Sequence, residues 1–167
     1  MITVRLAITD DAPALARISN EIHAMHVAGR PSDFKAGGDG DVFTADRMRS
    51  LLGAPGHFVW VADSGSDVAG FAHAVLSDEP DMPWRSAVRV LELKAMGVTA
   101  AHRGGGLGVQ LLDAVYRAAQ AHGAREIRLT VWGFNDGARR FYRRHGFVLR
   151  NEQLGRTVER DDADEAP

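Results

Sequence analysis

Apolar side chains recur along this chain with two different periods. In residues 2–8 they occupy every second position, which is the period of a β-strand. Between Leu15 and Met25 they recur every three or four residues, which is the period of one face of a helix. Asp10, Asp11 and Pro13 come just before that stretch and are typical of a helix start. The chain is therefore predicted to begin with a strand and a helix.

The rest of the chain consists of segments that show one or the other of these two periods, and glycine, proline and polar residues separate them. Further helices are predicted over residues 45–52, 107–122 and 135–145, and further strands over residues 57–62, 68–76, 88–98, 124–132 and 147–149. Loops are predicted over residues 29–41 and 77–87. Hairpins followed by strands that alternate with helices predict an α/β fold with a mixed central sheet.

The predicted strand over residues 88–98 carries two charged side chains in an apolar setting. Its even-numbered residues share one face if no bulge intervenes, and Glu92 and Lys94 interrupt that face. A buried carboxylate without a partner is costly. Glu92 therefore either pairs with Lys94 or another neighbour, or it lines a cavity.

Composition narrows the class of protein. A length of 167 residues predicts one domain, over residues 1–158, followed by an acidic and disordered tail over residues 159–167. With 20 basic and 22 acidic residues, the formal net charge of -2 argues against nucleic-acid binding. The absence of cysteine excludes disulfides and a thiol nucleophile. No stretch reaches the roughly 18 apolar residues of a membrane span, so a cytoplasmic protein is expected.

A glycine cluster links the strand over residues 88–98 to the helix over residues 107–122. It reads Arg-Gly-Gly-Gly-Leu-Gly over residues 103–108. The start of a helix presents unpaired N–H groups and the positive end of its dipole, so this segment predicts an anion site. No Lys-Ser or Lys-Thr pair follows, which excludes a nucleotide P-loop, and Val109 replaces the third glycine of a dinucleotide fingerprint.

Two motifs carry a resemblance to a known family. Residues 103–108 fit the pattern [QR]xxGx[GA], and Asn135, Ala138, Tyr142, Gly146 and Phe147 fit NxxAxxxYxxxGF. In this order and spacing they resemble the GNAT superfamily of acyl-CoA-dependent N-acetyltransferases. Over residues 90–148 the resemblance rests on matching sequence motifs. It implies a GNAT fold, in which helices flank a mostly antiparallel sheet that splays between its fourth and fifth strands.

The resemblance also implies acetyl-CoA as co-substrate and no metal. Its pyrophosphate would lie on the glycine cluster, and its pantetheine arm would pair with the end of the preceding strand. The implied cofactor-binding residues are Met96, Gly97, Val98, Arg103, Gly104, Gly105, Gly106, Leu107, Gly108, Val109, Asn135, Ala138 and Tyr142.

Three residues receive catalytic roles from positions that match the family. Glu92 is the candidate base, because an amine with a pKa of about 10 is almost wholly protonated at pH 7. The Met96 N–H is the candidate oxyanion donor, and the Tyr142 phenol is the candidate acid toward the leaving thiolate. The alternatives are an ion pair of Glu92 with Lys94 or an arginine, and a packing role for Tyr142.

The expected acceptor is a primary amine, on a small molecule or on a peptide or protein. The candidate substrate contacts are His26, Phe34, Trp84 and Glu92. His23 and His26 lack the HExxH pattern of a zinc site. The alternatives are a transferase of longer acyl groups and an acyl-CoA-binding module without turnover. Because members of the family often dimerise, a homodimer is one assembly that the resemblance allows.

Overall fold

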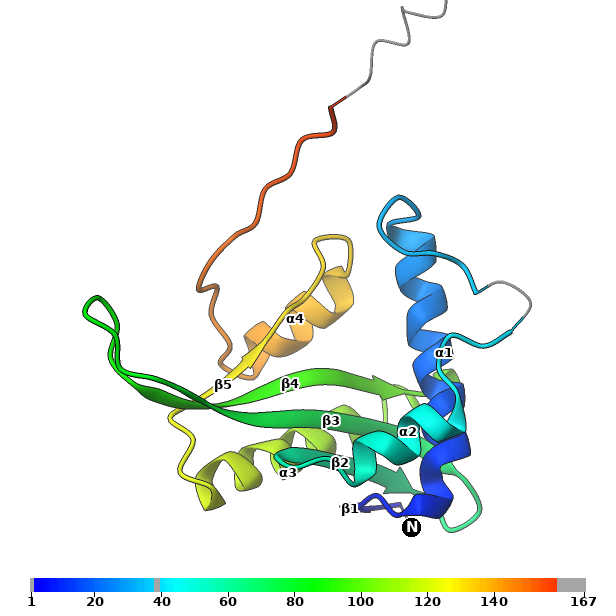
Figure 1. Cartoon of the computed structure of the whole chain (residues 1–167). Coiled ribbons are helices and arrows are strands. Elements are labelled where there is room, and N and C mark those ends of the chain that lie inside the picture. The colour runs from blue at the N-terminus through cyan, green and yellow to red at the C-terminus, as the bar shows by residue number, and fades with distance from the viewer. Residues whose placement is uncertain (1, 38–39, 159–167) are drawn as a thin grey trace, which may run out of the picture. The chain divides into compact units, whose positions relative to one another are not determined.

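The structure is a computed structural model, and it describes residues 2–37 and 40–158. One five-stranded sheet has the order β1-β2-β3-β4-β5 (Figure 1). The strands are β1 (Thr3–Leu6), β2 (His57–Asp63), β3 (Val68–Glu79), β4 (Val88–Val98) and β5 (Glu126–Leu129). The first three pairings are antiparallel and that of β4 with β5 is parallel, so the predicted mixed α/β fold is confirmed.

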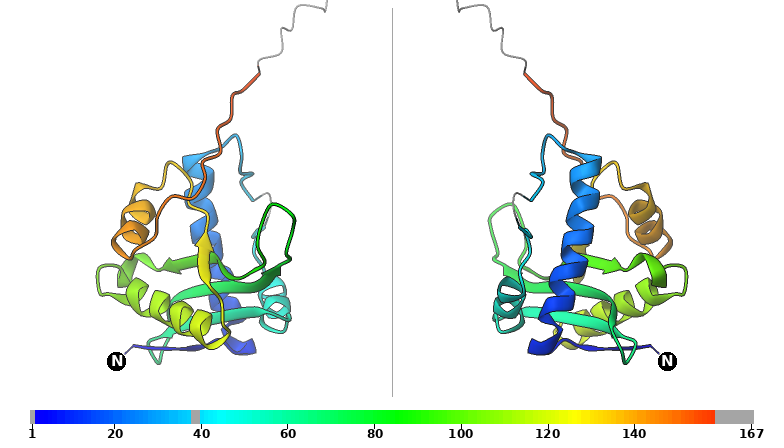
Figure 2. Two further views of the ribbon diagram at one scale, coloured as in Figure 1. Left: turned by 90° about the vertical axis from the view of Figure 1, so that its left-hand side faces the viewer. Right: turned by 90° about the vertical axis from the view of Figure 1, so that its right-hand side faces the viewer.

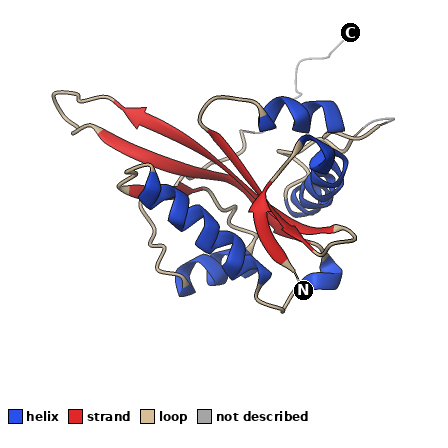
Figure 3. Cartoon of the chain, turned by 90° about the horizontal axis from the view of Figure 1, so that it is seen from below, coloured by secondary structure: helices blue, strands red, loops and turns tan. Residues whose placement is uncertain are grey.

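Helices cover both faces of this sheet (Figures 2 and 3). Helices α1 (Ala12–Gly29) and α2 (Ala45–Leu52) lie on one face, and α3 (Leu107–Ala121) lies on the other. Thr44 begins α2 by accepting a hydrogen bond from the Arg47 amide at 3.3 Å. Two short 3₁₀ turns, η1 (Thr9–Asp11) and η2 (Ala100–His102), precede α1 and α3. None of the helices in the described ranges is long and apolar enough to cross a membrane.

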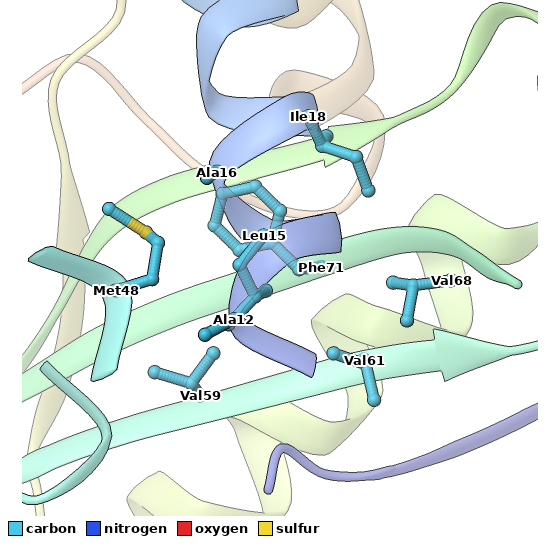
Figure 4. Packing of buried hydrophobic residues seen from close by; sticks show 9 residues of the cluster. All are labelled: Ala12, Leu15, Ala16, Ile18, Met48, Val59, Val61, Val68 and Phe71. Carbon is cyan, nitrogen blue, oxygen red and sulfur yellow. The ribbon is translucent and has the colours of Figure 1, made fainter. Parts of the chain in front are cut away.

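The core beneath α1 forms where its apolar face meets β2 and β3 (Figure 4). Leu15 and Ile18 of α1 are at most 2% exposed and pack toward the sheet, where Phe71 of β3 is 3% exposed. These are positions that the helical period predicts. Burial of one such side chain contributes on the order of 1.5–3 kcal/mol, which holds α1 on the sheet.

The fourth and fifth strands separate partway along their length. Residues 90–93 of β4 pair in parallel with residues 126–129 of β5, and that pairing ends at Leu93 and Leu129. Strand β4 continues to Val98 with β3 on its other side. The β5-facing edge of its last five residues therefore has no strand partner in the described part of the chain. This is the splay that the resemblance implies.

Several predicted boundaries were wrong. The strand predicted over residues 68–76 extends to Glu79, and its pairing with β4 shortens the loop predicted over residues 77–87. The strand predicted over residues 124–132 is limited to the four residues that β4 can pair. Residues 147–149 form no strand within the described chain, because no neighbouring segment pairs with them. The predicted tail over residues 159–167 lies outside the described residues.

The chain divides into two compact units. The first unit is Met1–Phe134 and contains the whole sheet, and the second begins at Asn135. The second unit contains α4 (Asp136–Arg144), whose N-cap Asn135 accepts a hydrogen bond from the Ala138 amide at 3.0 Å. Tyr142 and Phe147 pack edge to face in it, with ring centroids 5.4 Å apart. The number of domains stays a prediction.

One charged cluster connects β1, β2 and the start of α1. Arg5 donates two hydrogen bonds to the Asp11 carboxylate, at 2.7 and 2.9 Å, and one to Asp63 at 2.8 Å. Asp11 also accepts the Ile8 amide at 2.7 Å, although its side chain is only 7% exposed. Three donors therefore compensate a carboxylate that is nearly buried.

Replacing Asp11 by alanine should lower the free energy of unfolding by about 2–4 kcal/mol, because Arg5 and the Ile8 amide lose their acceptor. Urea unfolding measures the loss. Asp67→Ala is the matched control, since its pair with Arg17 is exposed on both sides and should contribute less than about 1 kcal/mol.

The Asp11 loss should also depend on pH. The Arg5 hydrogen bonds lower the pKa of Asp11 below its ordinary value, against the opposing effect of burial. Its stabilisation is therefore complete above the unfolded pKa of about 3.9 and disappears as the pH falls through the lower folded value. A difference between wild type and variant that stayed constant from pH 7 to pH 2 would contradict this.

Candidate functional site

A β-bulge on β4 sits where the sheet opens. His73 of β3 pairs with Ala95 and Ala74 pairs with Leu93, so Lys94 is an extra residue between the two pairs. A bulge therefore does intervene in residues 88–98, so their even-numbered residues do not all share one face. The bulge lies directly after Leu93, the last residue of β4 that pairs with β5.

Glu92 and Lys94 form an ion pair beside this bulge. The Lys94 Nζ lies 2.6 Å from the Glu92 Oε2, and the two side chains are 45% and 41% exposed. One of the two predicted arrangements of Glu92, pairing with Lys94, is therefore present. The Glu92 carboxylate faces solvent and an ammonium group rather than an enclosed apolar cleft.

The open part of β4 contains Met96, Gly97 and Val98. These residues pair on the β3 side with Ala72, Phe71 and Gly70. A Cβ atom at Gly97 would lie 2.6 Å from the Ile22 Cδ1, so glycine allows α1 to approach the strand closely. The Val98 carbonyl accepts a hydrogen bond from the Arg103 Nε at 3.0 Å, which fixes the predicted cofactor loop to the end of β4.

The glycine cluster forms the predicted cradle of amides. The amides of Arg103 and Val109 donate to the carbonyls of Ala100 and Gly106. Between them, the five amides of residues 104–108 have no hydrogen-bond acceptor in the described ranges of the chain. Unpaired amides at the start of a helix of 15 residues favour an anion in front of them.

Two glycines of the cluster adopt backbone angles that other residues rarely reach. Gly104 has φ +82° and Gly106, the N-cap of α3, has φ +80°. Gly105, between them, does not have a positive φ. The turn before the cluster is held by Thr99, whose amide donates to Ala69 at 2.9 Å and whose hydroxyl pairs with His102 at 2.9 Å.

An aromatic cluster connects the end of α1 to the segment after β5. Phe34 meets Trp132 edge to face with centroids 4.9 Å apart, and His26 contacts the Phe34 ring at 5.1 Å and the Phe134 ring at 5.8 Å. The Arg30 guanidinium lies 5.7 Å from the centre of the Trp132 ring. This cluster brings the predicted substrate contacts His26 and Phe34 together.

Sequence reasoning missed Trp132 and Phe134 as members of this cluster. Their strand-like pattern placed Trp132 in the sheet, although it follows the end of β5. The signal available was the density of aromatic residues in Trp-Gly-Phe just before the second motif.

Trp84 lies apart from the other predicted substrate contacts. It belongs to the loop that joins β3 to β4, and its side chain is 78% exposed. Figure 1 shows this loop at the opposite end of β4 from Val98. Twelve residues separate Trp84 from Met96 along this hairpin, and a strand extends about 3.3 Å per residue, so the structure does not bring Trp84 together with the other candidates.

The candidates of the second unit lie on α4 and at its N-cap. Asn135 caps α4 through the amide of Ala138. Tyr142 packs between Phe141, at 5.2 Å, and Phe147. Burial raises the pKa of Tyr142 to about 12, so its phenol keeps its proton at neutral pH.

Comparison with known proteins gives consistent matches. The model of the acetyltransferase (GNAT) family matches residues 21–147. N-acetyltransferase 8F1 of Rattus norvegicus is 33% identical over 103 residues, which are 62% of this chain and 44% of that protein. The match therefore spans less than half of the length of this relative.

Solved structures share the fold. The tetramutant of the BH1408 protein from Bacillus halodurans superposes with a TM-score of 0.88 at 23% identity, over 93% of this chain and 99% of that one. A predicted acetyltransferase of Clostridium acetobutylicum, solved with acetyl-CoA, has a TM-score of 0.68 at 18% identity, over 94% and 96%.

Gly106→Ala should destabilise the fold by about 1–2 kcal/mol, because the φ of +80° forces an L-residue into the left-handed region. Gly105→Ala is the matched control and should change stability by less than about 0.5 kcal/mol, since its added Cβ would meet only the His102 carbonyl at 3.8 Å. Thermal unfolding of both variants measures the difference. Equal losses would show that backbone strain is not the reason for glycine at position 106.

Proposed function

The chain belongs to the acetyltransferase (GNAT) family, and we propose that it is an N-acetyltransferase that moves the acetyl group of acetyl-CoA to a primary amine. The amine attacks the thioester directly, in a ternary complex. One observation carries the proposal: the edge of β4 over residues 94–98 has no strand partner among the described residues, and it leads into residues 104–108, whose five amides have no acceptor there. An extended arm that ends in a pyrophosphate complements both features.

The cofactor would bind along this continuous run of backbone groups. In the proposal the pantetheine arm pairs with Met96, Gly97 and Val98, and the pyrophosphate accepts the amides of residues 104–108. The amides of Arg103 and Val109 already donate within the chain. Their backbones therefore shape the loop around the pyrophosphate without donating hydrogen bonds to it. Asn135, Ala138 and Tyr142 of the second unit are assigned to the cofactor by the family motif that they match.

The chemistry requires a base, an oxyanion donor and an acid. Glu92 takes the proton of the attacking amine, and the Met96 N–H stabilises the negative charge that develops on the thioester oxygen. Tyr142 donates a hydrogen bond to the departing thiolate, a role that its raised pKa of about 12 supports, because the phenol stays protonated. The acetyl carbon gains a bond to nitrogen and loses its bond to sulfur.

The acceptor enters from the side that His26 and Phe34 line. Their half-buried rings lie on α1 and on the loop that follows it, so they suit contact with the part of the acceptor that carries the amine. The acceptor is a primary amine of a small molecule or of a peptide.

Release of CoA thiol from acetyl-CoA, measured with a broad panel of amines and peptides, tests the function and the base together. We expect turnover with one acceptor class, and a fall in kcat of about 10²- to 10⁴-fold in Glu92→Gln. Lys94→Gln is the matched control, since it breaks the same ion pair without removing the carboxylate. A similar loss in both variants would mean that the ion pair matters and the base does not.

Two other outcomes would redirect the proposal. Faster release from a longer acyl-CoA would change the donor but keep the reaction. No release with any amine, although acetyl-CoA raises the melting temperature, would favour a binding module without turnover.

Tyr142→Phe should lower kcat by more than about threefold while the Kd of acetyl-CoA changes little, because the hydrogen bond forms chiefly as the thiolate leaves. Tyr116→Phe, which removes an exposed phenol on α3, is the control and should leave kcat unchanged. The wild-type rate should show no loss from Tyr142 ionisation below about pH 10, as its raised pKa requires. A smaller effect on kcat would leave Tyr142 a packing residue.

A further inference from the structure

Two histidines that the proposed chemistry does not use share a hydrogen bond inside the sheet. The Nε2 of His73 on β3 lies 3.0 Å from the Nδ1 of His57 on β2, and the rings stack with centroids 5.1 Å apart. One proton between two ring nitrogens satisfies both when each imidazole is neutral. The Nδ1 of His73 makes no hydrogen bond to the chain over the residues that the structure describes, so it can accept one from water.

The strand register places this pair on the same face as Glu92. His57 pairs with Val75, and Val75 pairs with Glu92, so these three residues form one row across β2, β3 and β4. The next row is Val59, His73 and Ala95. His73 is thus the diagonal neighbour of both His57 and Glu92. Diagonal neighbours lie about 7–8 Å apart, which long side chains and one bridging water can span.

The surroundings of His73 keep it neutral. Burial, the His57 ring and the charge of Lys94 lower its pKa to about 4. His57 faces it from β2, and from β4 the charge of Lys94, which is paired with Glu92, acts on it. Among the described residues that line the pocket beside it, α1 and α2 contribute side chains that do not titrate, namely Leu15, Ser19, Met48 and Leu51.

We propose that His73 and His57 form a proton relay, which carries the proton that Glu92 takes from the acceptor amine across β3 to the start of β2. The relay rests on the proposed function. It is needed because the bound cofactor and acceptor would cover Glu92, whose carboxylate otherwise faces solvent. His57 lies two strands from that opening and is half-buried, so its far nitrogen offers a separate exit.

Each step of the relay exchanges one bond to hydrogen for another. The protonated Glu92 gives its proton to the bridging water, and that water gives one to the His73 Nδ1. The proton on the His73 Nε2 moves to the His57 Nδ1, and the His57 Nε2 releases its own proton to solvent. Both rings then carry their protons on the opposite nitrogens and return by rotation or by exchange with water. A weakly basic His73 suits this role, because it passes the proton on instead of retaining it.

Three variants, assayed for CoA release with an acceptor that the wild type uses, test the relay. His57→Gln and His73→Asn should each lower kcat by about tenfold, below the full effect of a general base, with unchanged KM for the acceptor and unchanged Kd for acetyl-CoA. Added imidazole should restore part of the rate of His73→Ala, which a purely structural loss would not allow. His122→Gln is the control, because its ring contacts Phe58 at 4.7 Å without taking part in the pair.

A double variant decides whether the histidines act through Glu92. In the Glu92→Gln background, His57→Gln should change kcat by less than about twofold, since a relay without its donor has no proton to carry. A full tenfold loss there, or unchanged kcat in both single histidine variants, would overturn the relay and leave the acetyltransferase intact. If no acceptor in the panel supports release of CoA by the wild type, the proposed function is overturned and the relay with it. His57→Gln keeps the experiment decisive if His73→Asn does not fold.

Discussion

The pairing of β4 with its parallel partner β5 ends at Leu93. The rest of the site is arranged around the backbone groups of β4 that have no strand partner beyond this point in the described chain. A strand edge inside a protein must find hydrogen bonds in another strand, in water or in a ligand. Here the edge opens over the last five residues of β4 and leads into a turn and a helix start that also leave amides unpaired. Two successive segments, the end of β4 and residues 104–108, thus leave backbone groups without a partner in the described part of the chain, and one long ligand suits both.

The rest of the first unit holds this edge open. The bulge at Lys94 changes the course of β4 where β5 departs, and Gly97 lets Ile22 of α1 pack directly on the open strand. Arg103 ties the glycine cluster back to Val98. The Phe34 ring, in the loop after α1, packs on Trp132 beyond the end of β5. Because each contact lies within the first unit, the opening is a property of that unit itself.

The bulge also decides which residue of β4 lies opposite His73. In a regular strand Lys94 would pair with His73, but the extra residue places Ala95 in that position. The ion pair of Lys94 with Glu92 lies beside the bulge and is half-exposed. His73 and Ala95 both line the apolar pocket on that face of the sheet.

The sequence by itself determined the helices, the places of the first four strands and the glycine cluster at the start of α3. The period of Leu15 and Ile18, the Thr44 and Asn135 caps and the glycines of residues 104–108 act locally, within a turn or two of helix. The extent of β5, the bulge at Lys94, the meeting of Phe34 with Trp132 and the bond between His57 and His73 depend on the tertiary structure. These features arise between segments far apart in the chain, and strand register and packing, which no local pattern encodes, decide which residues meet.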